Sequence, residues 1–155
     1  MAVRVIDRGT RIRRSALYEI IYLLRADIDL NMIFNVLHII KRQDDTVDYD
    51  NLILRVMVAA ILDGHTAGDI SIFMKTLIQG GAKKIILDIA GLDFIDSSGI
   101  SVLIQIAKML RHVNGDIALL NVPERIQLLF QPIKLNRFIQ MFNTEDEAIN
   151  FFKMV

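Results

Sequence analysis

The sequence predicts an α/β domain in which helices pack on a mostly parallel β-sheet, preceded by an N-terminal helical extension. Strand-like and helix-like stretches alternate after residue 46, which is the order expected of a parallel sheet with right-handed crossovers. Four aspartates without a basic residue occupy residues 44–50 and mark a boundary. Hydrophobic residues make up 53% of the 155 residues, which excludes a disordered chain.

Residues 12–42 are expected to form two amphipathic helices or one long bent helix. Apolar side chains recur at helical spacing in two sets, and Asp29 is placed to cap the second set, over residues 33–40. Two such helices cannot bury both apolar faces alone, so we expect them to dock on the rest of the chain or to pair two copies in a homodimer. We therefore divide the chain into an extension over residues 1–46 and a domain over residues 47–155.

The first half of the domain is expected to run strand, helix, strand. Residues 52–62 are rich in Leu, Val and Ile, which indicates one strand. Thr66 and Asp69 have the spacing of a capping box, which starts a helix, and two consecutive glycines end it. Residues 84–90 are apolar at their centre and predict a buried strand.

The second half of the domain begins with a predicted helix over residues 98–112. Its apolar side chains lie on one face, and its last turn carries basic residues that suit the negative end of the helix dipole. The sequence Asn-Gly then ends the helix. The remaining elements are expected in the order strand, short helix, strand and terminal helix: residues 116–122, 123–130, 138–142 and a helix that starts with a capping box at residues 144–147.

Composition and charge exclude several classes of protein. The chain has no cysteine, which excludes disulfides, thiolate metal sites and a cysteine nucleophile. Its 18 basic residues balance 18 acidic ones, so no global field favours nucleic acid. The longest charge-free runs, residues 30–40 and 97–107, have eleven residues each, whereas a membrane-spanning helix needs about 20. Residues 1–14 lack the apolar core of a signal peptide, so we expect a cytoplasmic protein with no nucleic-acid partner, membrane span or cofactor.

Two polar turns, residues 62–66 and 92–99, follow predicted strands at the edge where parallel sheets place their sites. Ser97 or Ser98 in the second turn is expected to be the N-cap of the next helix. Gly99 is expected to leave the surface around these hydroxyls open, because it has no side chain.

A serine in the second turn can carry a phosphate, because free backbone N–H groups at a helix N-terminus accept an anion. A phosphate adds a charge of about −1.5 to −2 at pH 7. This charge would lie beside Asp93 and Asp96, with Asp63 expected from the neighbouring turn. The added charge would change the sign and shape of a docking surface, which indicates a binding switch. Asp and Ser are also common caps, so the pattern alone leaves a structural role open.

Residues 85–103, with the sequence IILDIAGLDFIDSSGISVL, resemble the signature of the STAS family, and in particular that of its anti-sigma factor antagonists. The turn that starts Leu-Asp-Gly-His-Thr-Ala at residue 62 resembles the other functional loop of the family. The resemblance covers residues 47–155 and implies a STAS-like fold. Two departures stand out. Ala60 and Ile61 replace the usual Gly-Glu, which removes an acid that would contact a kinase, and residues 1–46 have no counterpart in the simple one-domain antagonists.

The resemblance implies that Ser97 is the phosphorylated residue, because it directly follows the family's aspartate. Seven residues of the two turns are expected to support partner binding and phosphorylation, either because the resemblance implies them or because they lie beside such residues. They are Asp63, His65, Thr66, Asp93, Asp96, Ser98 and Gly99. In the cycle that it implies, the unphosphorylated protein binds a histidine-kinase-like ATPase that is both an anti-sigma factor and a Ser kinase. This binding releases a sigma factor, phosphorylation separates the complex, and a metal-dependent phosphatase of the PP2C type resets it.

Two other classes of function remain open on the sequence. One is a scaffold subunit of a stressosome-like or other multi-protein assembly, which self-associates through the N-terminal helices. The other is an enzyme, because Asp63, His65 and Ser97 could gather at one end of the sheet. A nucleophile elbow requires Gly-x-Ser-x-Gly, which Asp-Ser-Ser-Gly is not, and the three histidines lack metal-ligand spacing, so we expect a protein without enzymatic activity.

Overall fold

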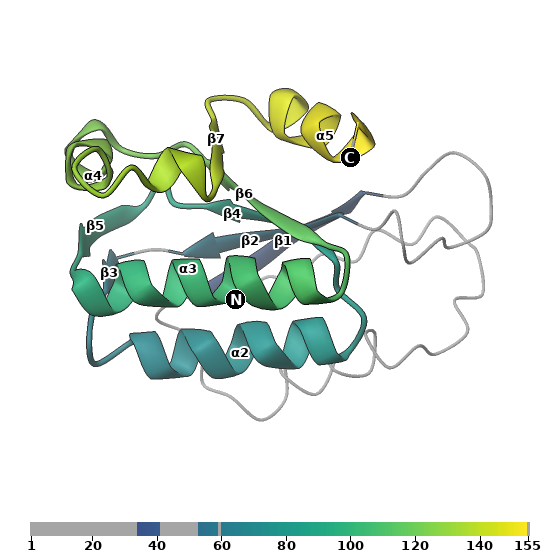
Figure 1. The fold of residues 1–155 in the computed structure, drawn as a ribbon, viewed down its shortest axis with the longest axis horizontal. Coiled ribbons are helices and arrows are strands. Elements are labelled where there is room, and N and C mark those ends of the chain that lie inside the picture. The colour runs from purple at the N-terminus through teal and green to yellow at the C-terminus, as the bar shows by residue number, and fades with distance from the viewer. Residues whose placement is uncertain (1–33, 41–52, 59, 155) are drawn as a thin grey trace.

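The computed structural model describes residues 34–40, 53–58 and 60–154, which form a five-stranded sheet with helices on both faces (Figure 1). In spatial order the strands are β1 (Phe34–Ile40), β2 (Ile53–Val58), β4 (Lys84–Asp88), β6 (Asp116–Leu120) and β7 (Gln140–Phe142). β1 pairs antiparallel with β2, and the other neighbouring strands of this sheet are parallel. The mostly parallel sheet predicted from the alternating pattern is therefore confirmed.

The strand β1 corrects the interpretation of residues 33–40 as a helix. Phe34 lies opposite Val58 and Ile40 lies opposite Ile53 in the antiparallel ladder. A short apolar run cannot be assigned to a helix or a strand by periodicity alone, and here the pairing with β2 decides. The rest of the helical extension expected over residues 12–42 lies outside the described residues.

Residues 52–62 contribute two strands rather than the one expected. β2 ends at Val58, and β3 (Ala60–Leu62) pairs in parallel with β5 (Leu92–Ile95), a strand that the sequence pattern did not predict. Ala60 has a φ of 67°, in the left-handed region that costs L-residues about 1–2 kcal/mol. The Gly that the resemblance implies at this position would adopt such a φ without that cost. β3 and β5 form a two-stranded sheet separate from the five-stranded one.

Two long helices cover one face of the main sheet, and a third helix covers the other (Figure 1). The helices are α2 (Ala67–Gln79), α3 (Ser97–His112), α4 (Glu124–Phe130), α5 (Glu145–Met154) and the short 3₁₀ helix η2 (Leu135–Arg137). Successive strand residues point to opposite faces, so Leu87 of β4 joins the core under α2 and α3, whereas Ile86 joins Ala148 and Phe152 of α5. Within the described ranges, no helix combines the length and the apolar character needed to cross a membrane.

The start of α5 is fixed by a capping box and by ion pairs. Glu147 N donates to Thr144 Oγ1 and Thr144 N donates to the Glu147 carboxylate, each at 3.3 Å, which confirms the predicted box. Arg55 of β2 donates to the carboxylates of Glu145 and Asp88. Asp88 is buried, and the pairing is needed there because removing one partner of a buried ion pair costs about 3–5 kcal/mol. The network therefore anchors α5 to the centre of the sheet.

Candidate functional site

The structure brings the two polar turns together at one end of the molecule. β3 and β5 are parallel, with Leu62 opposite Ile95, so the turns that follow them leave the β3–β5 sheet at the same edge. Asp96 N donates to the Leu62 carbonyl at 3.2 Å, and Gly64 N donates to Asp96 Oδ2 at 3.3 Å. The side chain of Asp96 thus connects both turns. Gly64 was not singled out from the sequence, although Asp-Gly is a common turn signal.

Asp96, rather than either serine, is the N-cap of α3. Its Oδ1 accepts hydrogen bonds from Ser98 N at 2.8 Å and from Gly99 N at 3.0 Å. The expectation that Ser97 or Ser98 caps the helix is therefore wrong. Because the carboxylate satisfies the free N–H groups, neither serine hydroxyl is needed as a cap.

Ser97 is the first residue of α3 and is exposed, whereas Ser98 is half-buried. Across the described part of the chain, no group forms a hydrogen bond with the Ser97 hydroxyl. Ser98 Oγ faces the other turn and lies 3.6 Å from where a Cβ on Gly64 would stand. Of the two serines, Ser97 is therefore the more exposed.

Asp63 holds the first turn and carries a negative charge beside the second. Its Oδ1 accepts hydrogen bonds from His65 N at 2.9 Å and from Thr66 N at 3.1 Å. The bond from His65 N is the main reason that the pKa of the Asp63 carboxyl is lowered, and Thr66 N lowers it further. Asp63 is therefore ionised at neutral pH. It lies in the turn that Asp96 connects to α3.

Thr66 supports this loop differently from what its spacing predicts. It stands at the N-cap position of α2, but its side chain does not cap the helix, so the capping box expected with Asp69 is wrong. Its Oγ1 instead accepts a hydrogen bond from Asp63 N at 3.0 Å and lies 3.0 Å from the Ile61 carbonyl, to which it donates. Thr66 therefore fixes the backbone on both sides of Leu62, while the neighbouring His65 is exposed.

Asp93 is exposed on β5, and its charge is paired. Arg125 of α4 donates to Asp93 Oδ1 at 2.8 Å and to the Leu92 carbonyl at 3.0 Å. The ion pair joins α4 to β5, a contact that the sequence did not indicate. Asp63 and Asp96 form no ion pair among the described residues, although His65 also lowers the pKa of Asp63 electrostatically.

Gly99 is buried in the first turn of α3, so the expectation that it leaves the surface around the serine hydroxyls open is wrong. A Cβ at this position would lie 2.3 Å from the Leu62 carbonyl oxygen and 2.7 Å from Ile95 Cγ1. The missing side chain allows α3 to start directly against β3 and β5. The close packing of α3 on β3 and β5 therefore requires glycine at position 99, two residues after Ser97.

Replacing Asp96 by alanine is expected to lower the free energy of unfolding by about 1–2 kcal/mol, because it removes the N-cap of α3. Urea unfolding followed by far-UV circular dichroism measures this change. Asp93→Ala serves as the control, because the exposed ion pair with Arg125 contributes about 0–1 kcal/mol. Equal losses in the two variants would contradict the capping role of Asp96.

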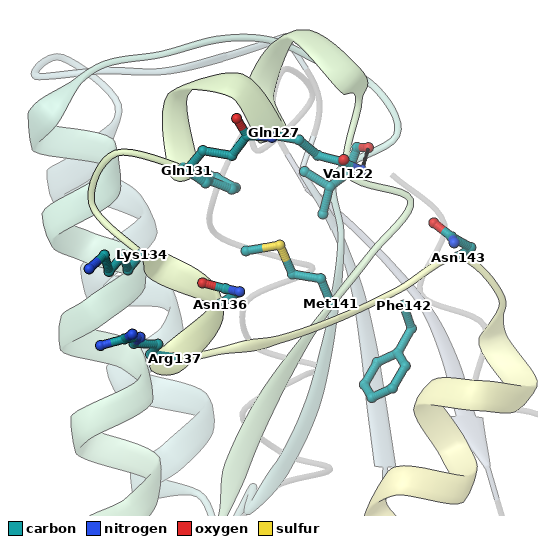
Figure 2. Close-up of a pocket in the computed structure, with 10 residues that line it drawn as sticks. Val122, Gln127, Gln131, Lys134, Asn136, Arg137, Met141, Phe142 and Asn143 are labelled. Atoms are coloured by element: carbon teal, nitrogen blue, oxygen red, sulfur yellow. Dashed lines mark hydrogen bonds between the residues drawn. The ribbon is translucent and has the colours of Figure 1, made fainter.

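A cavity of about 530 Å³ lies away from these turns, between α4, η2 and β7. Figure 2 shows Asn136 pointing toward Met141 inside it, while Lys134 and Arg137 extend outward from it. None of the candidate site residues lines this cavity. Among the residues that the structure describes, no cluster of three or more His, Asp or Glu side chains could hold a metal ion.

The fold and the signature around Ser97 agree with comparisons to known proteins. A family model described as the STAS domain matches residues 39–148, so the chain belongs to the STAS domain family. BtrV of Bordetella bronchiseptica, a candidate anti-sigma factor antagonist, is 24% identical over 111 residues, which cover 70% of this chain and 93% of BtrV. The anti-sigma F factor antagonist of Paenibacillus polymyxa is 26% identical over 104 residues, covering 66% of this chain and 89% of that protein.

Solved structures of the anti-sigma factor antagonist SpoIIAA share the fold. Its unphosphorylated form is 25% identical, with a TM-score of 0.56, and the match covers 79% of this chain and 99% of SpoIIAA. Its phosphorylated form, from Bacillus, is 26% identical, with a TM-score of 0.54, over 76% of this chain and 97% of SpoIIAA. The chain is thus a STAS-domain protein similar to anti-sigma factor antagonists, as its signature predicts.

Proposed function

We propose that this chain is a protein-binding module that phosphorylation of Ser97 switches off. The observation that carries the proposal is the exposed hydroxyl of Ser97, free of hydrogen bonds within the described residues, at the start of a helix that Asp96 already caps. A phosphoryl group at this position keeps the helix intact, because negative charge at a helix N-terminus is favourable. The same group adds charge next to ionised Asp63, so the surface that it occupies changes more than the fold does.

The proposed partner is an anti-sigma factor with Ser-kinase activity and a histidine-kinase-like ATPase fold. It binds the unphosphorylated chain in the cytoplasm, transfers phosphate to Ser97 and then dissociates, and a PP2C-type phosphatase restores the hydroxyl. Two observations on relatives support the proposal: both curated relatives are described as anti-sigma factor antagonists, and SpoIIAA has been solved in a phosphorylated form. In this cycle the chain is a substrate and a binding partner rather than an enzyme.

The proposal predicts that a kinase of this class adds one phosphate to the chain, on Ser97. Each purified histidine-kinase-like Ser kinase of the source cell is incubated with the chain and Mg-ATP, and peptide mass analysis locates the phosphate. Ser97→Ala is expected to abolish the modification. Ser101→Ala, which removes another exposed α3 hydroxyl one turn away, is expected to leave it unchanged. Undiminished phosphorylation of Ser97→Ala would refute the assignment.

A further inference from the structure

Two large apolar side chains are exposed side by side on the β3–β5 sheet. Ile61 and Phe94 lie directly opposite each other in the parallel ladder, and they are 43% and 51% exposed. The next pair in the ladder, Leu62 and Ile95, is buried beneath them against the core. We call Ile61 and Phe94 the apolar pair.

The apolar pair lies close to Ser97. Phe94 precedes Ser97 by three residues, so their Cα atoms are separated by at most about 11 Å. Ile61 is one strand away from Phe94, at the usual spacing of about 5 Å. Thr66, in the loop of Asp63, binds the carbonyl of Ile61 directly. Both residues of the apolar pair are therefore exposed within about 16 Å of Ser97 along the backbone.

The size of a protein interface indicates that a partner at Ser97 reaches the apolar pair. A specific interface buries about 800 Å² on each partner, which corresponds to a disc of about 16 Å radius. A kinase that seats its active site on Ser97 with such a contact covers both residues of the pair. Large apolar side chains that become desolvated near the centre of an interface contribute much of its affinity.

We propose that the apolar pair is the hydrophobic anchor for the partner that phosphorylates Ser97, and that the partner presents an apolar patch there. This inference rests on the proposed function and specifies its binding surface. The charged residues around the pair fit this arrangement: ionised Asp63 and capping Asp96 form an acidic rim beside an apolar centre.

The test uses the kinase that phosphorylates the wild-type chain, titrated with each variant in the presence of a non-hydrolysable ATP analogue. Phe94→Ser is expected to weaken binding about tenfold, and Ile61→Ser about threefold. Ile61→Glu is expected to weaken binding more than Ile61→Ser, because a carboxylate then faces an apolar patch. Tighter binding of Ile61→Glu would overturn the proposal, since it would indicate a basic group on the partner.

Phe138→Ser is the matched control, because Phe138 is also an exposed phenylalanine, at 48%, but lies far from Ser97. Its carbonyl accepts a hydrogen bond from Arg111, which is in the last turn of α3, at the opposite end of the helix from Ser97. It is expected to bind as the wild type does. If the kinase phosphorylates the wild type and the apolar-pair variants bind it within about twofold of the unphosphorylated wild type, the anchor alone is overturned. A wild type that no kinase phosphorylates overturns the proposed function as well. Light scattering that shows a wild-type oligomer dissociating in Phe94→Ser assigns the pair to a second copy and also overturns the anchor.

Discussion

Replacing Gly99 by alanine is expected to destabilise the fold by a net amount of about 2 kcal/mol. The new Cβ would stand 2.3 Å from the Leu62 carbonyl oxygen and 2.8 Å from Leu62 Cγ, so the start of α3 must move away from β3. Overpacking of this kind costs about 1–3 kcal/mol or more, and the better helix propensity of alanine returns about 1 kcal/mol. Chemical unfolding followed by far-UV circular dichroism measures the change, since the chain has no tryptophan.

Gly68→Ala is the control for this prediction, because Gly68 also lies in the first turn of a helix. A Cβ on Gly68 would meet no atom within 4 Å, so this variant is expected to be as stable as the wild type or up to about 1 kcal/mol more stable. The two substitutions are chemically identical and differ in what the methyl group touches. A Gly99→Ala variant with wild-type stability would contradict the close packing of α3 on β3.

The displacement expected from Gly99→Ala also reaches Ser97. Ser97 precedes Gly99 by two residues, and Asp96 caps the helix through the N–H of Gly99. Moving this backbone changes where the Ser97 hydroxyl lies relative to the turn of Asp63. The packing of the helix start and the position of the Ser97 hydroxyl are therefore expected to be coupled.

Local patterns in the sequence predicted most of the elements after residue 60. The apolar stripe and basic last turn of α3 and the capping box of α5 act within one turn of the chain, and the structure confirms both. The two turns with Asp63 and Ser97 were also expected to lie at the same edge of the sheet. That expectation needs only parallel strands, which the alternation of elements indicates.

The features that were missed depend on contacts between distant segments. Residues 34–40 have helical apolar spacing, yet the ladder to β2 makes them a strand. The end of β2 falls inside one apolar run, and the left-handed φ of Ala60 that follows it gives no signal in the residue type. Gly99 suggested an open surface, because the sequence does not reveal that Leu62 lies against it.

The sequence also could not predict that Asp96, rather than one of the serines, is the N-cap of α3. Asp and Ser both cap helices well, so the order of Asp96, Ser97 and Ser98 alone does not decide which residue is the cap. In the structure, Asp96 has an extended backbone and its carboxylate reaches both N–H groups of the first turn and Gly64 of the other turn. Asp96, which the sequence suggested as a residue that supports partner binding and phosphorylation, is thus the N-cap that positions Ser97.

Ser97→Asp is expected to weaken binding of the kinase partner about tenfold or more while leaving the fold as stable as the wild type. A carboxylate at the first position of α3 suits the helix dipole, so the variant keeps or slightly gains stability. At the docking surface the same charge adds to those of Asp63 and Asp96, and burying it against a partner costs desolvation. Titration of the partner, together with chemical unfolding of the free variant, separates these two effects.

Ser97→Asn distinguishes charge from shape, because asparagine has nearly the same size as aspartate and is neutral. It is expected to bind the partner more tightly than Ser97→Asp, and the difference between the two is expected to shrink as salt is added. If Asn and Asp weaken binding equally at every salt concentration, steric exclusion rather than charge controls the surface. A phosphate carries up to twice the charge of aspartate, so the unmodified and phosphorylated chains should differ by more than Ser97→Asn and Ser97→Asp do.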